Sequence, residues 1–207
     1  SRAQLSRARL LRMARRRMKT EIKKLSNTKI QIPFFDKANK SLKIINIGRL
    51  TDQKDQITLL KSINKIAKII DLRLIILGRG IYYKVLKSFI KKNNLSKFIK
   101  IINFKKNPYK YIRKSDLFIL TSKYEGLPNV LLEAMTLKKF IISTNCPTGP
   151  KEILQNGRYG SLCKVGDFNK VAKEIIKFNA NRKRYNKVCN QAYKSLDRFD
   201  YKNNLNK

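Results

Sequence analysis

The sequence has no histidine and only three cysteines, Cys146, Cys163 and Cys189. The cysteines are far apart and odd in number, and no paired Cys or His spacing is present. This excludes the usual zinc motifs and argues against a disulfide framework. We therefore interpret the cysteines as reduced thiols of a cytoplasmic protein and expect no metal site.

Long hydrophobic runs are also missing. No apolar run approaches the roughly 18 to 20 residues that a membrane-spanning helix needs. No apolar block of the usual length follows the Arg-rich start, so a secretory signal is not indicated. The 207 residues suffice for a sizeable core, and we expect one domain with appendages in the cytoplasm.

Acidic residues are scarce: 13 Asp and Glu stand against 49 Lys and Arg, and the formal net charge is +36. One interpretation is a nucleic-acid binder, because clustered cations release counterions from phosphate backbones. A second is a Lys-rich coding bias that fills solvated faces, and the scatter of lysines over nearly every segment favours it. A third is a cationic surface that rests on anionic lipid headgroups, where each Lys or Arg contributes on the order of 1 kcal/mol. Charge alone does not decide between them.

The start of the chain differs in composition from the rest. The first 17 residues, SRAQLSRARLLRMARRR, contain seven Arg and no Lys, whereas Lys dominates from Met18 onward. We expect residues 1–41 to be an Arg-rich leader and linker of foreign or misassigned origin, outside the fold. Leu11, Met18, Ile22 and Leu25 predict an amphipathic cationic helix there.

From residue 42 onward, short apolar runs alternate with segments whose apolar residues recur at helical spacing. The apolar runs predict strands at 42–48, 72–78, 98–104, 116–122, 139–144 and 160–165. The helical spacing predicts helices or helical turns at 56–70, 82–94, 107–115, 129–137, 149–156 and 167–178. Asp167 is expected to cap the last of these. Residues 181–207 predict a further helix and a frayed tail.

This alternation predicts the fold class. Strands that are apolar almost throughout, each followed by a helix, indicate a parallel sheet covered on both faces. Right-handed crossovers then give a doubly wound, Rossmann-like α/β domain of six strands over residues 42–180. Ligands of such sheets bind beyond the carboxyl ends of the strands. At that edge we expect Gly48-Arg49, Gly78-Arg79-Gly80, Phe104-Lys105 and Glu125-Gly126.

The segment GRLTDQKD (48–55) indicates a site for a diphosphate. Arg49 leaves the first strand, and Lys54 lies near the start of the next helix, whose N–H groups and dipole also favour anions. Two solvated cations are an equally valid interpretation in a chain this basic. LGRG (77–80) lacks the third glycine of the dinucleotide fingerprint, so a structural turn explains it as well.

The segment YEGLPNVLLEAM (124–135) favours the ligand site. Gly126 permits a close backbone approach, and Pro128 with Asn129 begins a helix whose first N–H groups have no helical partner. Glu133 lies one turn inside that helix, and Glu125 lies at its mouth. Because carboxylates accept hydrogen bonds from paired hydroxyls, two of them beside a diphosphate site indicate a sugar and a ribose.

The order of these motifs, GRL with a following Lys, LGRG, SDLFILTS and EGLPNVLLEA, resembles a known family. It is similar to the C-terminal, donor-binding domain of retaining GT-B glycosyltransferases of family 4, over residues 42–177. STNCPTGPKEILQNGRYGSL (143–162) resembles members that build bacterial surface polysaccharides and glycans on lipid carriers. The resemblance implies transfer of a hexose or N-acetylhexosamine from a UDP-type nucleotide-sugar to a glycan or lipid-linked acceptor.

The resemblance also implies roles for particular residues. Arg49 and Lys54 would hold the donor diphosphate, Glu125 would bind the hydroxyls of the transferred sugar, and these three would form the catalytic set. Glu133 would bind the ribose hydroxyls. The remaining donor-binding positions would be Gly78, the segment of Phe104 and Lys105, which would border the base, and the backbone N–H groups of Gly126, Leu127 and Asn129. The resemblance implies no cofactor, because the leaving diphosphate is stabilised electrostatically.

The sequence departs from the family in three ways. Asp55 follows the lysine where many members have Gly, and Pro128 can donate no N–H to the ligand. The family's N-terminal, acceptor-binding domain has no counterpart in these 207 residues. We therefore expect a truncated form, or one that relies on a partner subunit for the acceptor.

Two other functions stay open at this point. One is a nucleotide-sugar-binding partner subunit or inactive fragment, and the other is a basic nucleic-acid-binding module. The sequence lacks the aromatic-interleaved basic stripes of an RNA-recognition sheet, so we expect no specific nucleic acid. An anionic membrane surface remains among the candidate partners and would hold the chain peripherally at the inner face of the membrane.

Overall fold

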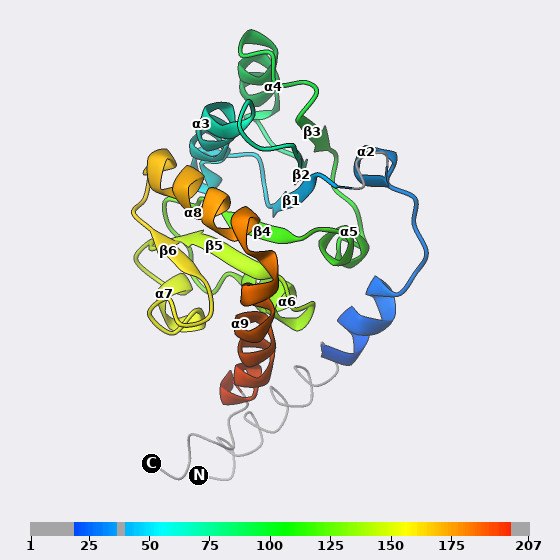
Figure 1. Cartoon of the computed structure of the whole chain (residues 1–207), viewed down its shortest axis with the longest axis vertical. Helices are drawn as coiled ribbons and strands as arrows, with labels where there is room; N and C mark the ends of the chain where they lie inside the picture. The colour runs from blue at the N-terminus through cyan, green and yellow to red at the C-terminus, as the bar shows by residue number, and fades with distance from the viewer. Residues whose placement is uncertain (1–18, 37–39, 200–207) are drawn as a thin grey trace.

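The computed structural model describes residues 19–36 and 40–199. Six strands form one sheet in the order β3-β2-β1-β4-β5-β6, and every neighbouring pair is parallel (Figure 1). The strands are β1 (Leu42–Ile47), β2 (Leu72–Leu77), β3 (Ile99–Ile102), β4 (Leu117–Leu120), β5 (Phe140–Thr144) and β6 (Ser161–Cys163). This order is that of a Rossmann-like sheet, and the predicted fold class is confirmed.

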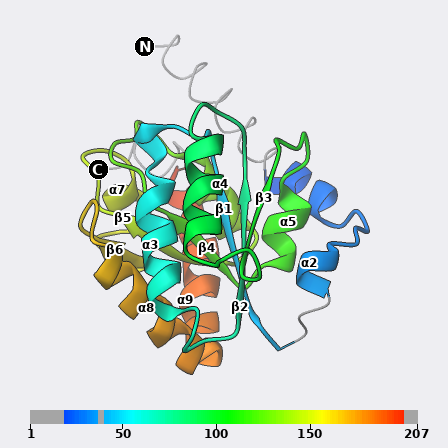
Figure 2. The same ribbon diagram turned by 90° about the horizontal axis from the view of Figure 1, so that it is seen from above.

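Helices cover both faces of the sheet. They are α2 (Pro33–Asp36), α3 (Gln56–Ile66), α4 (Tyr83–Lys92), α5 (Tyr109–Lys114), α6 (Asn129–Thr136), α7 (Pro150–Ile153), α8 (Phe168–Ala180) and α9 (Arg182–Ser195). Residues 19–26 form a further helix, and η1 (Asp52–Lys54) and η2 (Leu196–Phe199) are 3-10 turns. One core lies between the sheet and α3, α4 and α8, and the other lies between the sheet and α2, α5, α6 and α7 (Figure 2).

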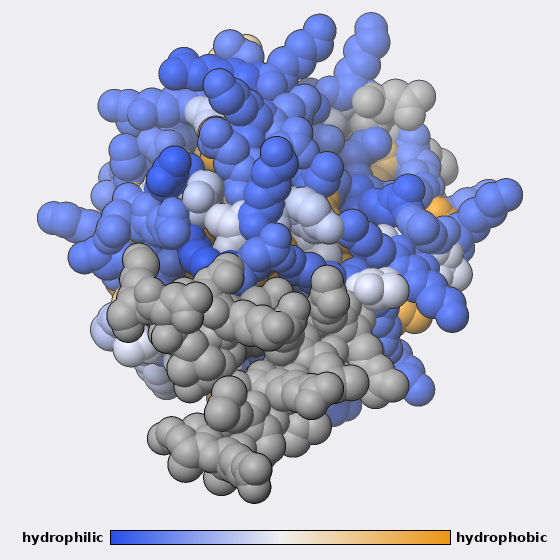
Figure 3. All heavy atoms as spheres, turned by 90° about the horizontal axis from the view of Figure 1, so that it is seen from below, coloured by the Kyte–Doolittle hydropathy of each residue, from blue (hydrophilic) through white to orange (hydrophobic). Residues whose placement is uncertain are grey.

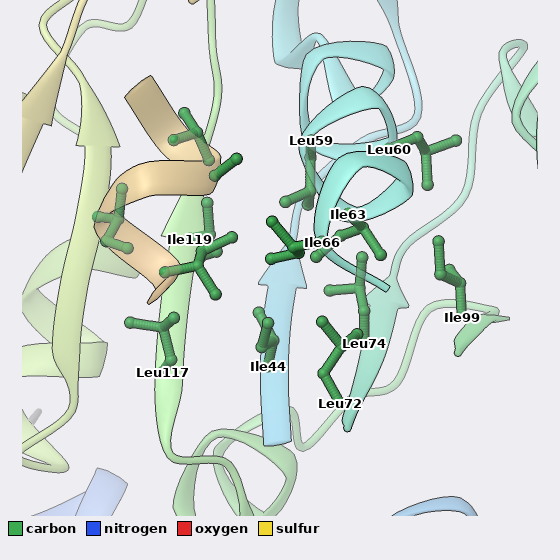
Figure 4. Packing of buried hydrophobic residues seen from close by; sticks show 14 of the residues in the cluster. Ile44, Leu59, Leu60, Ile63, Ile66, Leu72, Leu74, Ile99, Leu117 and Ile119 are labelled. Carbon is green, nitrogen blue, oxygen red and sulfur yellow. The ribbon is translucent and has the colours of Figure 1, made fainter. Parts of the chain in front are cut away.

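Strand β1 shows why the sheet needs two covers. Ile44 belongs to the core under α3, and the next residue, Ile45, belongs to the opposite core. Successive side chains of a strand point to opposite faces, so a strand that is apolar throughout must be buried on both. Figure 4 shows Ile63 and Ile66 of α3 packed over Ile44 and its neighbours on the adjoining strands.

Helix ends follow the local sequence closely. Asp167 caps α8 as predicted, because its carboxylate accepts from the Lys170 N–H at 2.8 Å. Helix α3 is shorter than predicted: it ends at Ile66, and turns lead into β2. Pro108 is the N-cap of α5.

The N-terminal segment differs from the expectation for residues 1–41. Residues 19–26 are helical, and Ile22 is only 1% exposed. Phe35 of α2 belongs to the core beneath α5 and α6, and Lys23 Nζ donates to the Tyr193 hydroxyl at 2.6 Å. The described part of this segment therefore packs on the domain, because its apolar residues need cover as much as those of the later helices. Leu11 and Met18 of the expected amphipathic helix lie outside the described residues.

The surface is largely polar, and the three thiols are buried. Hydrophilic side chains cover most of the described part of the face seen in Figure 3. Cys146, Cys163 and Cys189 are free and buried, and burial raises the pKa of Cys163 to about 12 and that of Cys189 to about 11. Within residues 19–36 and 40–199, no helix is long and apolar enough to cross a membrane. The same residues contain no group of three or more acidic or Cys side chains that could hold a metal ion.

Candidate donor-binding site

The sheet order reverses between β1 and β4, so the segments that leave these strands lie side by side. A crevice opens at such a switch point in doubly wound sheets. Two hydrogen bonds join the segments here: Thr121 Oγ1 donates to the Lys54 carbonyl at 3.2 Å, and the Lys123 N–H donates to the Gln53 carbonyl at 2.8 Å. The two motifs predicted to bind a ligand therefore meet at this point of the fold.

Lys54 and Glu125 form an ion pair between these two segments. Lys54 Nζ lies 2.6 Å from Glu125 Oε1, and the side chains are only 16% and 6% exposed. Ser122 Oγ donates to the same carboxylate oxygen at 2.6 Å. Removing one partner of a pair this buried commonly lowers the free energy of unfolding by about 3 to 5 kcal/mol, because the other charge stays buried. The residues expected to bind a diphosphate and a sugar thus bind each other here.

Arg49 contributes an exposed cation beside this pair. Its Nη2 donates to Gln53 Oε1 at 3.3 Å, and Gln53 Nε2 donates to the Tyr124 carbonyl at 3.0 Å. Gln56 Nε2 holds the Arg49 carbonyl at 2.9 Å from the first turn of α3. No described acidic side chain forms an ion pair with Arg49, so its guanidinium can neutralise a bound anion.

The glycines after β2 are explained by close packing. A Cβ on Gly78 would lie 1.9 Å from the Gly48 carbonyl oxygen, and one on Gly80 would lie 2.3 Å from the Leu50 oxygen. Gly80 also has φ +157. These glycines let the segments after β1 and β2 touch. The structure therefore supports the interpretation of LGRG as a structural turn. Gly78 follows β2 at the same edge of the sheet as Gly48.

The turn after β4 presents backbone donors. The N–H groups of Gly126, Leu127 and Asn129 have no hydrogen-bond acceptor among the described residues. Pro128 lies between them as the N-cap of α6, and its carbonyl accepts from the Leu131 N–H at 2.9 Å. The predicted cradle keeps three donors and lacks the fourth, as the proline requires.

A second loop supports this turn, and local sequence patterns did not reveal it. Thr148 Oγ1 donates to the Glu125 carbonyl. Gly149 has φ +88, and a Cβ there would lie 2.5 Å from the Gly126 oxygen and 2.4 Å from Pro128 Cδ. The Thr-Gly-Pro run at 148–150 was a turn signal. That signal carries no information on which other turn this loop contacts.

Glu133 has a different environment from Glu125. It lies on the second turn of α6, and no described side chain donates to its carboxylate or pairs with it. Desolvation raises its pKa above the usual range. The nearby phenol of Tyr109 also has a raised pKa, from its own burial and then from the Glu133 charge. Glu133 is therefore a partly desolvated acceptor that lacks a donor.

Phe104 and Lys105 lie at the outer end of the strand edge. Both are exposed after β3, and the Arg79 guanidinium lies 5.7 Å from the Phe104 ring centroid. No hydrogen bond or ion pair joins either residue to the Lys54–Glu125 pair. Their predicted place beside a base remains a prediction.

Asp55 shows how the sequence departs from the family pattern at low cost. Its φ is 42, in the left-handed region that glycine adopts readily and Asp tolerates better than most residues. Its carboxylate accepts from the Thr58 N–H at 3.2 Å and the Thr58 hydroxyl at 2.6 Å, which caps α3. The capping bonds offset the strain at this position.

The family can now be assigned. The family model for glycosyl transferases group 1 matches residues 27–195. The chain belongs to the glycosyl transferases group 1 family. The predicted resemblance to GT-B glycosyltransferases is confirmed at this level.

Among sequence relatives, an uncharacterized glycosyltransferase of Methanocaldococcus jannaschii is 39% identical over 65% of this chain and 33% of its own length. A Campylobacter jejuni protein is 30% identical over 79% of this chain and 45% of its own length. It is named N-acetylgalactosamine-N,N'-diacetylbacillosaminyl-diphospho-undecaprenol 4-alpha-N-acetylgalactosaminyltransferase. This group 1 glycosyltransferase chain thus spans less than half of the length of these relatives.

Solved structures show the same fold. Anabaena HepE in complex with UDP superposes with a TM-score of 0.74 and 19% identity, over 84% of this chain and 50% of that one. The lipopolysaccharide outer core galactosyltransferase WaaB superposes with a TM-score of 0.72 and 21% identity, over 81% of this chain and 48% of that one. At these identities the likeness establishes the GT-B-type domain fold.

Proposed function

We propose that this chain is the donor-binding half of a retaining, family 4 glycosyltransferase. It would take a hexose or N-acetylhexosamine from a UDP-linked sugar and pass it to a glycan or lipid-linked acceptor in surface polysaccharide or glycan synthesis. The observation that carries the proposal is the cluster of Arg49, the Lys54–Glu125 pair and the unbonded N–H groups of Gly126, Leu127 and Asn129 at the switch point.

The donor diphosphate would exchange partners with this cluster. Arg49 and Lys54 would bind its oxygens, and Lys54 would release Glu125 as it does so. Glu125 would then accept hydrogen bonds from hydroxyls of the sugar, with Ser122 still orienting its carboxylate. The two cations and the N–H groups stabilise charge that develops on the leaving diphosphate. A side-chain base on this domain is not needed, because the departing diphosphate can take the acceptor's proton.

Glu133 would bind the ribose. Its carboxylate lies on α6, on the helix that the turn of Gly126 and Asn129 begins, so diphosphate and ribose sites follow one another along the chain. Two adjacent hydroxyls can each donate to one carboxylate oxygen. Such bonds would restore the hydrogen bonding that Glu133 lost on burial, and the UDP in the HepE complex supports this class of donor.

The acceptor side would come from another unit. Large apolar side chains stay exposed after β2, β3, β4 and β6, at Ile81, Phe104, Tyr124, Leu127 and Val165. They share the edge of the sheet that holds the proposed donor site, and a facing acceptor-binding unit would cover them. The name of the Campylobacter jejuni relative supports a lipid-linked acceptor. If that unit belongs to a separate chain, this chain is a nucleotide-sugar-binding partner subunit.

Calorimetric titration of the chain with UDP and with GDP tests the proposal. We expect binding of at least one of them, with UDP favoured, and weaker binding by Arg49→Ala. Circular dichroism of the same samples confirms that they are folded. No heat with either nucleotide in a folded sample would refute the proposal.

A further inference from the structure

A second cationic site shares no residue with the proposed donor site. The segment that links helical residues 19–26 to α2 runs past α5 (Figure 2), and the two enclose an open groove of about 590 Å³. Its lining contains four cations and no acid: Ser26, Asn27, Thr28, Lys29, Ile30, Gln31, Lys110, Arg113 and Lys114. None of these residues belongs to the strand-end segments that form the donor site.

Most of the positive charge in this groove is uncompensated. Lys114 is paired with Asp36 at 2.8 Å, but Lys29, Lys110 and Arg113 form no ion pair with any described residue. Lys110 stands three and four residues before Arg113 and Lys114, so the three cations share one helix face. Like charges at this spacing destabilise a helix. An anion bound between them would relieve the repulsion.

The segment that lines the groove also has backbone donors without an internal acceptor. The N–H groups of Lys29, Ile30 and Gln31, all in the lining, have no acceptor among the described residues. A bound anion can accept a hydrogen bond from an N–H group that has no internal acceptor, and cationic side chains beside it add to the attraction. The hydroxyls of Ser26 and Thr28 are already committed, since they donate to the Lys23 and Leu25 carbonyls.

From these observations we propose that the groove between residues 26–31 and α5 binds a phosphate group. The ligand's phosphate oxygens accept hydrogen bonds from the N–H groups of residues 29–31 and pair with Lys29, Lys110 and Arg113. Two sources present this chemistry: the headgroup of an anionic phospholipid at a membrane surface, and a soluble phosphate compound. The site is independent of the proposed donor crevice and stands whether or not that crevice binds UDP.

The experiment compares two triple variants of equal charge change. Lys29→Gln, Lys110→Gln and Arg113→Gln remove the groove cations. Lys84→Gln, Lys91→Gln and Lys92→Gln remove three exposed lysines of α4, on the other face of the sheet. Sedimentation with phosphatidylglycerol vesicles, against phosphatidylcholine vesicles, probes the lipid source. Amide chemical shifts during titration with inorganic pyrophosphate probe the soluble source, because they separate residues 29–31 from the donor crevice.

We expect the groove variant to bind the anionic vesicles or pyrophosphate roughly a hundredfold more weakly, and the α4 variant to change either affinity by only a few-fold. Loss of vesicle binding alone identifies a headgroup site, and loss of pyrophosphate shifts at residues 29–31 alone identifies a soluble phosphate. Equal weakening by the two variants would overturn the proposal, because diffuse charge then explains the binding. So would unchanged vesicle binding together with pyrophosphate shifts confined to residues 48–54 and 126–129.

Discussion

Glu125 and Glu133 lie eight residues apart at one edge of the sheet, yet their surroundings differ in kind. Glu125 is paired with Lys54 and accepts a hydrogen bond from Ser122. Glu133 has no described donor or counter-ion, and desolvation raises its pKa. A ligand of Glu125 would have to displace Lys54 or Ser122. A ligand of Glu133 would supply hydrogen-bond donors that this carboxylate lacks.

This difference separates two ways to prepare a site. The Lys54–Glu125 pair keeps both buried charges compensated in the free chain, and a diphosphate would have to compete with it. Burial of the Glu133 carboxylate lowers the stability of the free chain. Hydrogen bonds from bound hydroxyls would offset this loss, so the same carboxylate would raise the affinity for the ligand. Stability and affinity should therefore respond in opposite directions at the two glutamates.

The largest expected effect is on stability, from Lys54→Met. It leaves the Glu125 carboxylate buried with only Ser122 as a partner, and we expect the free energy of unfolding to fall by about 3 kcal/mol. Urea denaturation measures this. Lys123→Met is the matched control, because Lys123 pairs with Asp52 at the exposed surface and its loss should be undetectable. If the two variants unfold at the same urea concentration, the paired state of Glu125 contributes nothing.

The next effect is on affinity, from Glu133→Gln. Hydrogen bonds from ribose hydroxyls to a carboxylate are stronger than those to an amide, so we expect UDP to bind about tenfold to a hundredfold more weakly. Calorimetry with UDP measures this. Arg49→Ala should weaken UDP binding and Glu125→Ala should not, because UDP without its sugar would not reach Glu125. Equal losses in all three variants would contradict the separate roles.

A smaller effect of opposite sign is expected for the stability of Glu133→Gln. A carboxyl whose folded-state pKa is raised costs nothing below its unfolded pKa and destabilises the fold as pH rises through the folded pKa. At pH 7 the free energy of unfolding of Glu133→Gln should therefore be about 1 kcal/mol higher than that of the unchanged chain. The gain should disappear below about pH 4, where both states are protonated. Thermal melts across this pH range measure it; a gain independent of pH would mean that the carboxylate is not desolvated.

The smallest effect concerns competition at Lys54. Glu125→Gln removes the charge that holds the Lys54 ammonium, so a diphosphate no longer displaces a counter-ion. We expect UDP to bind roughly two- to fivefold more tightly to this variant. Calorimetry in parallel with the unchanged chain detects the difference. Weaker binding would show that Glu125 helps to position Lys54 for the phosphate.

Most of the fold could be predicted from the sequence because its signals are local. An apolar run predicted each strand of the sheet, and Asp167 predicted the start of α8. The prediction was wrong for residues 19–36. We placed them outside the fold because of the change of composition near Met18, but several of their apolar side chains are buried. The composition of a segment does not determine whether its apolar side chains are buried, because burial depends on the surfaces that the segment contacts.

The candidate site could be predicted only as a set of residues, without its contacts. The topology brought Arg49, Lys54 and Glu125 to one edge, but the ion pair joins side chains 71 residues apart, and no periodicity encodes it. The support that Thr148 and Gly149 give to the turn after β4 was missed for the same reason. Asp55, a departure in the sequence, became explicable only through its φ and its bonds to Thr58.

The central claim is that the crevice between β1 and β4 binds the nucleoside diphosphate of the donor. Amide chemical shifts recorded while UDP is added test it most directly, because they report the place of binding as well as its strength. We predict saturable shifts at Gly48, Gly126, Leu127 and Asn129, absent in Arg49→Ala at the same concentration. Shifts confined to residues 29–31 or scattered over the surface lysines, or no shifts in a folded sample, would contradict it.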